Sequence, residues 1–194
     1  MKFADEDEAL IAAARAGSPT AWDKLVRRYE SRIYNYGLRL LGNSTDAMDL
    51  MQEVFLGVYR NLHRFRGDAR FSSWIFRIAH NKAIDLNRRK ALLGGRAFSI
   101  DEIDLVDGDI HDDGARSREP DQQLFSARQN DEIQALLQKL SLEQRLVVEL
   151  KIYQSLTFDE IAGVQEISEN TAKTRFYTAM RKLKSILEKS HVLS

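Results

Sequence analysis

The 194-residue chain contains no cysteine, only four scattered histidines and no net charge. The lack of cysteine excludes disulfides and thiolate metal sites, and it fits a reducing compartment. The scattered histidines suggest no metal site, so we expect neither a metal nor a cofactor. No apolar run reaches the roughly 18 residues of a membrane span. The N-terminal MKFADEDEAL lacks the apolar core of a signal peptide, so we expect a cytoplasmic protein with no membrane insertion of its own.

The zero net charge conceals an uneven distribution along the chain. Residues 1–92 carry 16 Lys/Arg and 11 Asp/Glu, residues 93–125 carry 3 and 9, and residues 126–194 carry 10 and 9. The middle segment is therefore strongly acidic, and it contains glycines and a proline without a helical period. We predict a flexible acidic linker over 93–125 between folded domains at 1–92 and 126–194. The alternative is an ordered acidic loop of a single domain.

Residues that start and end helices occur throughout both predicted domains. Gly17 and Gly42 follow apolar periods over 5–16 and 20–41, and further helices are expected from 43–45 to about 63 and from near 72 to before Gly94. Capping residues in the second half are Ser141 with Gln144, Thr157 with Glu160, and Ser168. No stretch alternates β-branched and polar residues in the manner of a strand. The sequence predicts an all-α protein of two small helical domains.

Cations and aromatic residues are concentrated in RFRGDARFSSWIFRIAHNKAIDLNRRK, residues 64–90. A helical wheel places Ile75, Ala79, Ala83 and Leu86 on an inner face, opposite Trp74 and several polar residues. Cations hold phosphates, and aromatic faces stack unpaired bases for about 1–3 kcal/mol each. We predict a surface for single-stranded or opened nucleic acid, made by Arg66, Phe71, Ser72, Trp74, Arg77, Asn81, Asp85 and Arg88. The alternative is that Phe71, Trp74 and Phe76 are core residues and the arginines are merely solvated.

The preceding helix, within DAMDLMQEVFLGVYRNL, has an acidic outer face. Its expected buried stripe is Ala47, Met51, Val54, Phe55, Val58 and Leu62. The outer face carries Asp49, Gln52, Glu53 and Leu56, which is typical of a docking strip for a basic partner helix. An ordinary solvated helix face is the alternative.

The segment LTFDEIAGVQEISENTAKTRFYTAMRKLKSIL is typical of a helix-turn-helix. We predict a turn over about 163–167 and a second helix capped by Ser168. The apolar face of that helix is formed by Ala172, Phe176, Ala179 and Leu183. Its opposite face carries Asn170, Lys173, Thr174, Tyr177, Arg181 and Lys184, which are suited to reading a DNA major groove.

These stretches, in this order, resemble the extracytoplasmic-function group of the sigma-70 family, the promoter-recognition subunits of bacterial RNA polymerase. DAMDLMQEVF resembles region 2.2, RFRGDARFSSWIFRIAHNKAID resembles regions 2.3 and 2.4, and LSLEQRLVVELKIYQSLTFDEIA with NTAKTR resembles region 4. The resemblance implies that core polymerase binds Asp49, Gln52, Glu53 and Leu56, and that the 64–90 surface captures the −10 strand. It implies −35 contacts by Asn170, Thr171, Lys173, Thr174, Arg175, Tyr177 and Arg181. It also implies an anti-sigma factor as a partner.

Two other classes of function fit only part of the sequence. A stand-alone helix-turn-helix regulator would bind duplex DNA through the C-terminal domain, but it would not need the stacking surface at 64–90. An enzyme acting on nucleic acid would need a nucleophile–base pair, a metal cluster or a glycine-rich phosphate loop. The sequence indicates none of these, so we expect no enzyme.

Overall fold

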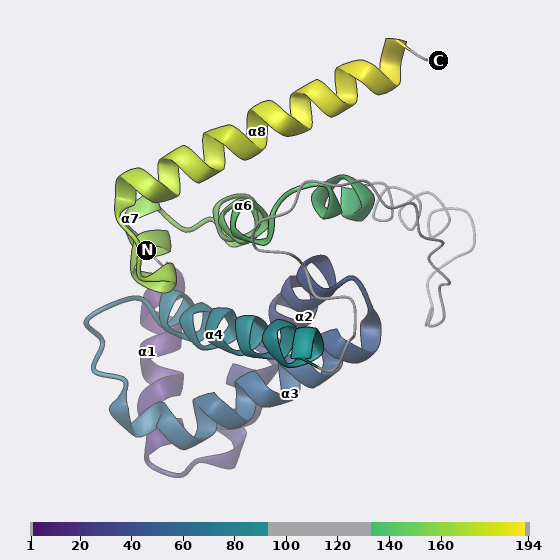
Figure 1. The fold of residues 1–194 in the computed structure, drawn as a ribbon. Helices are drawn as coiled ribbons and strands as arrows, with labels where there is room; N and C mark the ends of the chain where they lie inside the picture. Colours follow the sequence, from purple (N-terminus) through teal and green to yellow (C-terminus); the bar gives the residue numbers. More distant parts are fainter. Residues whose placement is uncertain (1, 93–132, 193–194) are drawn as a thin grey trace, which may run out of the picture.

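The computed structural model describes residues 2–92 and 133–192, and within these ranges it contains helices and no strand (Figure 1). The N-terminal domain consists of α1 (Lys2–Arg15), α2 (Pro19–Leu41), α3 (Ser44–Asn61), the 3₁₀ turn η1 (Leu62–Arg64) and α4 (Phe71–Leu92). The C-terminal domain consists of a helical segment at 133–138, α6 (Leu142–Val148), the π-helical turn η2 (Glu149–Tyr153), α7 (Phe158–Gln165) and α8 (Glu169–Val192). The all-α prediction is confirmed. The acidic segment 93–125 lies outside the described residues.

The predicted helix boundaries follow from local capping chemistry. The side chain of Asn43 accepts a hydrogen bond from the amide of Asp46 at the start of α3. Gly42 ends α2 with a left-handed φ of 78°, and its amide donates to Leu38 O. Both predicted capping boxes form, with Ser141 at α6 and Thr157 at α7. The caps therefore fix where these helices start and stop before any tertiary contact is considered.

The N-terminal domain packs around one face of α2. Leu25, Tyr29, Ile33, Tyr36 and Leu40 recur every three or four residues, and each is buried. The close approach of α3 depends on Gly37, because a Cβ added there would lie 3.0 Å from the Cα of Ala47. That spacing is tighter than nearly all real Cβ contacts, so a side chain at this position would require the backbone of α3 to shift by a few tenths of an ångström.

The C-terminal domain contains the predicted helix-turn-helix, with one difference in its turn. We expected the turn to begin near Gly163, but α7 continues to Gln165. The chain reverses at Glu166, which has a left-handed φ of 56°, and the Ile167 amide donates to Ala162 O. Gly163 lies within α7, where it is exposed with open space around it, so its presence did not mark the helix end.

The two domains pack against each other through two contact zones. In the first, the C-terminal part of α2 meets the 133–138 segment, α6 and η2. In the second, α7 lies against the beginning of α4 (Figure 1). A single hydrophobic cluster includes Phe76 of the N-terminal domain together with Leu146 and Ile161 of the C-terminal domain. The sequence predicted two folded units, but nothing in its pattern indicated that they share a core.

Candidate functional site

The outer face of α3 presents the predicted docking strip to solvent. Asp49 and Gln52 are exposed, and the side chain of Leu56 is 48% exposed. Tyr59, which the sequence analysis did not select, continues this face and is 68% exposed. Its ring rests edge-on against Trp22, with centroids 5.2 Å apart. The strip therefore combines carboxylate, amide and apolar groups on one accessible helix face.

Glu53, the fourth predicted residue of the strip, has an intramolecular partner. Its carboxylate accepts a hydrogen bond from Lys82 Nζ of α4 at 2.7 Å. This hydrogen bond, together with the positive charge of Lys82, lowers the pKa of Glu53. Glu53 is thus held as an anion and tied to α4, so a partner that approaches the strip also meets Lys82.

The aromatic residues before and at the start of α4 form a packed cluster. Phe71 is only 4% exposed, and its ring packs against Tyr29 and Phe65 with centroids 5.4 Å from each. Trp74 is half-buried and lies 5.3 Å from Phe65 and 5.6 Å from Phe71. Phe71 therefore cannot offer a free face to a base, contrary to its assignment from sequence, and it supports the accessible ring of Trp74 instead. Arg66, in the loop before α4, is exposed.

Polar side chains follow one another along the outer face of α4, as the helical wheel predicted. Arg77 and Asn81 are exposed, and Asp85 forms an i,i+3 ion pair with Arg88 at 3.2 Å. Ile75, Ala79 and Ala83 are buried on the opposite face, as expected, and Leu86 is partly buried against the core. Ser72 is half-buried at the first turn. This face offers a ring, an amide, a carboxylate and cations in one line.

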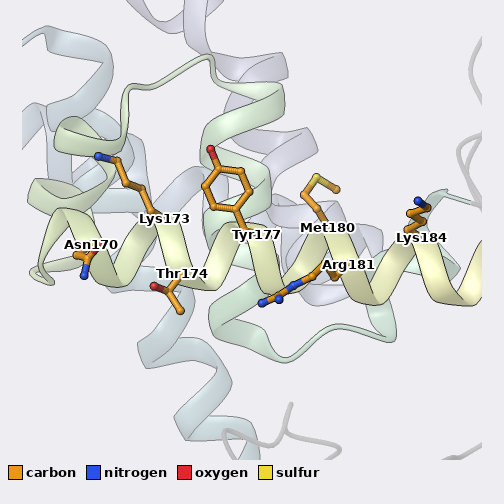
Figure 2. Close-up of a pocket in the computed structure, with 7 residues that line it drawn as sticks. All are labelled: Asn170, Lys173, Thr174, Tyr177, Met180, Arg181 and Lys184. Atoms are coloured by element: carbon orange, nitrogen blue, oxygen red, sulfur yellow. The ribbon is translucent and has the colours of Figure 1, made fainter.

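The outer face of α8 forms a shallow depression lined by polar side chains (Figure 2). Its lining residues are Asn170, Lys173, Thr174, Tyr177, Met180, Arg181 and Lys184. Tyr177 is 57% exposed, and Lys173 is held near the helix start by an ion pair with Glu169 at 2.7 Å. Five of the seven residues predicted to contact −35 DNA therefore share one exposed helix face.

The remaining two predicted residues of this helix have structural partners. Thr171 belongs to the N-cap of α8, where its amide donates to Ser168 Oγ at 3.0 Å. Arg175 is turned towards α6 and forms an ion pair with Glu143 at 2.8 Å. These contacts brace the helix-turn-helix. Neither residue lines the depression in Figure 2.

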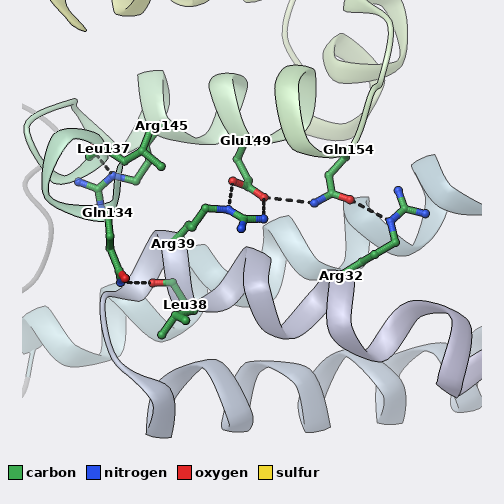
Figure 3. A network of polar contacts seen from close by, with 8 residues as sticks. All are labelled: Arg32, Leu38, Arg39, Gln134, Leu137, Arg145, Glu149 and Gln154. Atoms are coloured by element: carbon green, nitrogen blue, oxygen red, sulfur yellow. Dashed lines mark hydrogen bonds and ion pairs between the residues drawn. The ribbon is translucent and has the colours of Figure 1, made fainter. Parts of the chain in front are cut away.

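A polar network between the domains was not anticipated from sequence (Figure 3). Glu149 of η2 has a side chain with 0% exposure, and it receives two hydrogen bonds from Arg39 of α2, at 2.6 and 2.7 Å. Gln154 donates to the same carboxylate and accepts a hydrogen bond from Arg32 Nε. Burial raises the pKa of Glu149, while Arg39 and Gln154 act in the opposite direction. The network joins α2 to the C-terminal domain through a buried charge pair.

Arg145 is a second buried charge at the same junction. It is 1% exposed, and its guanidinium donates to the carbonyl oxygens of Leu40, Leu137, Gln138 and Leu140. Leu40 lies in the last turn of α2, Leu137 and Gln138 end the 133–138 segment, and Leu140 lies just after it. The last carbonyls of a helix lack intrahelical donors and carry partial negative charge. Arg145 therefore caps the C-termini of two helices from different domains.

An apolar groove was also missed by the sequence analysis. It has a volume of about 740 Å³ and lies between the 133–138 segment, η2 and α8. The exposed side chains of Ile133, Ile152 and Leu187 contribute to its walls. These apolar residues come from three separate segments, so no single helical period could reveal their convergence.

The described part of the chain contains no cluster of three or more His, Asp or Glu side chains that could hold a metal ion. None of the helices over these residues is long and apolar enough to cross a membrane.

Comparison with known proteins assigns both domains to one family. The model of sigma-70 region 2 matches residues 25–92, and the model of sigma-70 region 4 matches residues 130–183. The ECF RNA polymerase sigma factor SigE of Mycolicibacterium smegmatis is 31% identical over 87% of this chain, which spans 62% of that relative's length. The RNA polymerase sigma-H factor of Pseudomonas aeruginosa is 27% identical over 97% of both chains. The ECF RNA polymerase sigma-E factor of Escherichia coli is 26% identical over 89% of this chain and 90% of its own length.

Solved structures agree with this assignment. The structure of CnrH in complex with the cytosolic domain of CnrY matches with a TM-score of 0.69 and 25% identity, covering 95% of this chain and 99% of CnrH. The sigma factor RpoE of Bartonella quintana, solved with the anti-sigma factor NepR, has the same fold at a TM-score of 0.63 and 18% identity, over 86% and 96% of the two chains. The chain thus belongs to the sigma-70 family, as a sigma factor of its extracytoplasmic-function group.

Proposed function

We propose that this protein directs bacterial core RNA polymerase to specific promoters and opens the promoter at the −10 element. The observation that carries the proposal is the presence on one chain of two different exposed surfaces whose side chains suit nucleic acid. One is the mixed aromatic and polar face of α4, and the other is the polar depression on α8. A duplex reader requires only the second surface, whereas an initiation factor uses both.

The α3 strip is the proposed docking surface for core polymerase. Its members Asp49 and Gln52 are exposed beside the apolar Leu56. A basic partner helix can pair with the carboxylate while it buries the apolar side chain. Tyr59 extends the apolar part of the same surface.

The α4 face is the proposed site for the non-template strand of the −10 element. A base that leaves the stack costs a few kcal/mol, and the pocket that receives it must recover this energy by stacking and hydrogen bonding. Trp74 offers a supported ring, and Asn81 offers an exposed amide one helical turn beyond Arg77. Arg66 and Arg88 are exposed cations that can hold the strand's phosphates.

The α8 depression is the proposed reader of the −35 duplex. Base-edge contacts discriminate sequences by about 1–3 kcal/mol each, while phosphate contacts strengthen all sequences alike. Asn170 and Thr174 carry the amide and hydroxyl needed for base edges, and Arg181 and Lys184 carry charges suited to phosphates. Thr178 and Met180 stand where the family commonly has arginine, so this helix relies on fewer cations.

Strand capture by these surfaces uses binding energy and requires no catalytic group of this chain, which we propose is not an enzyme. We place its action in the cytoplasm, together with polymerase and DNA. We also propose control by an anti-sigma factor, because the sigma factor RpoE was solved with the anti-sigma factor NepR, and CnrH was solved with the cytosolic domain of a second protein, CnrY.

Run-off transcription with core polymerase on a library of promoter sequences tests the proposal. The expected result is polymerase-dependent transcription from a subset of promoters that share −10 and −35 elements. A stand-alone regulator would instead protect duplex DNA without polymerase and would leave the transcript pattern of core polymerase unchanged.

A further inference from the structure

Two side chains with apolar surfaces stand in the middle of the outer face of α8. Tyr177 is 57% exposed, Met180 is half-buried, and both line the depression in Figure 2. Together with Lys173 and Lys184 they form one row along the helix, because neighbours in this row are three or four residues apart. The polar members of the face form a second row beside it: Asn170, Thr174 and Arg181. The apolar pair therefore has a lysine at each end and polar side chains along one side.

The ring of Tyr177 is held in place by its neighbours. Its centroid lies 5.5 Å from that of Phe176 and 6.2 Å from that of Phe158, which belongs to α7. The ring of Phe158 is itself contacted by the ammonium of Lys151, which lies 4.7 Å from the ring centroid. A side chain that is fixed before binding loses little conformational freedom when a ligand covers it. Tyr177 is therefore a preorganised surface, and the flexible thioether of Met180 can adapt to what lies against it.

The cations of the depression have contacts along their own helix. The pairs are Lys173–Glu169 at 2.7 Å, Arg181–Thr178 at 3.2 Å and Lys184–Glu188 at 3.7 Å. Guanine in a major groove is read best by a cation that donates to its O6 and N7 atoms. The ring and thioether of the apolar pair carry no charge, so they suit a different base. The C5-methyl group of thymine is the apolar group that the bases present in that groove.

We infer that Tyr177 and Met180 determine specificity at the −35 element by enclosing the C5-methyl group of a thymine. The inference rests on the proposed reading of the −35 duplex by α8. Thr174, three residues before Tyr177, is placed to hydrogen-bond a base edge beside that methyl group. Burial of one methyl group strengthens binding by roughly fourfold.

Replacement of thymine by uracil tests the inference, because uracil lacks only the methyl group and keeps the hydrogen-bonding pattern of the base. The probe is the promoter that the complex of the full chain with core polymerase uses best in the run-off library. Each thymine of its −35 region, on either strand, is replaced in turn, and the affinity of the complex is measured by competition with the unmodified promoter. We expect uracil to weaken binding by roughly fourfold at one thymine or at two adjacent thymines, and to have no effect at the others.

Variants of the pair show which side chains hold the methyl group. Met180→Ala and Tyr177→Ala should bring the ratio of the affinities for the thymine and uracil promoters close to one, whereas a merely structural defect would weaken both promoters alike. Met180→Leu and Tyr177→Phe should keep the ratio at about four, because they retain the apolar surface. Lys184→Ala is the matched control from the same row, and it should weaken both promoters alike while the ratio stays unchanged.

Two results would overturn the thymine contact alone. One is a preferred −35 region that has no A·T pair, or whose thymines can all be replaced without loss of affinity. The other is an undiminished ratio in both alanine variants. Either result leaves the proposed function standing, because the complex still selects its promoters. Failure of the complex to select any promoter would instead refute the proposed function, and the thymine contact with it.

Discussion

Replacement of Arg145 by methionine is expected to destabilise the protein strongly, although the side chain belongs to neither proposed DNA surface. The guanidinium donates to four backbone carbonyls at 2.9–3.2 Å, and methionine can donate to none of them. Each buried acceptor left without a donor costs about 1–3 kcal/mol. Part of this cost is offset, because the variant no longer has to desolvate a cation. Removal of one side of a buried charged network has a net cost of about 3–5 kcal/mol, and we expect a loss in this range.

Burial lowers the pKa of Arg145 to about 10, so the side chain remains a cation at pH 7. Charge alone does not account for its role, because the four carbonyls lie around a planar fork of donors. Arg145→Lys keeps the positive charge, but its compact ammonium group cannot donate to the carbonyls of both helix ends at once, as the planar guanidinium does. Its destabilisation should be intermediate, about 1–3 kcal/mol.

Urea unfolding followed by circular dichroism at pH 7 measures these changes. With a slope of about 2 kcal/mol/M, a loss of 3–5 kcal/mol moves the unfolding midpoint down by roughly 1.5–2.5 M. Arg27→Met, an exposed replacement on α2, should move it by less than about 0.3 M. If Arg145→Met and Arg27→Met unfold at the same midpoint, the capping of two helix ends by Arg145 contributes nothing measurable, and the reasoning is wrong.

Four further predictions concern the surfaces and the pH response. Asp49→Arg should weaken competition for core polymerase, because it reverses the charge of the α3 strip without touching the core. Lys173→Ala should change −35 preference in run-off assays while polymerase binding stays at the wild-type level. Asn81→Ala should slow open-complex formation, and a pre-melted promoter bubble should restore it; a bubble that fails to rescue a folded variant would refute the strand-capture role. Burial lowers the pKa of His80 from 6.5 to about 4, so between these pH values the unfolded chain binds a proton at His80 more readily than the folded chain. The free energy of unfolding therefore has its full value above pH 6.5 and falls as the pH decreases towards 4. The loss is at most about 3 kcal/mol, and His80→Gln should flatten the fall in unfolding free energy between pH 7 and pH 5.

Local signals in the sequence predicted most of the N-terminal domain and the helix-turn-helix. The period of apolar residues along α2 and the capping side chains at Asn43, Ser141 and Thr157 each act within one or two helical turns. Such signals can be seen without knowledge of the tertiary structure. The outward face of α8 followed from the same kind of reasoning, because a buried Ala172 fixes which residues lie opposite it.

The predictions were less complete where an interaction joins distant segments. Phe71 follows a loop, and nothing in its local spacing showed that Tyr29 and Phe65 would enclose its ring. Arg145 and Glu149 did carry a signal, as charges four residues apart in the apolar run LEQRLVVEL. At that spacing the obvious expectation is an ion pair within one helix. The structure instead gives each residue a partner on α2, because both side chains are buried at the junction between the domains.

The two interdomain contact zones differ in how much they can contribute to the packing of the domains. The Arg77–Glu166 pair is exposed on both sides, and pairs of this kind contribute at most about 1 kcal/mol. A strand that brings several phosphates to Arg66, Arg77 and Arg88 gains in addition from the release of counterions. The carboxylates on α7 therefore cannot by themselves keep a strand away from α4. The packing of the two domains therefore depends mainly on buried groups. These are the shared hydrophobic cluster, which includes Phe76, Leu146 and Ile161, and the hydrogen-bonded charges at the end of α2, where Arg39 satisfies the Glu149 carboxylate.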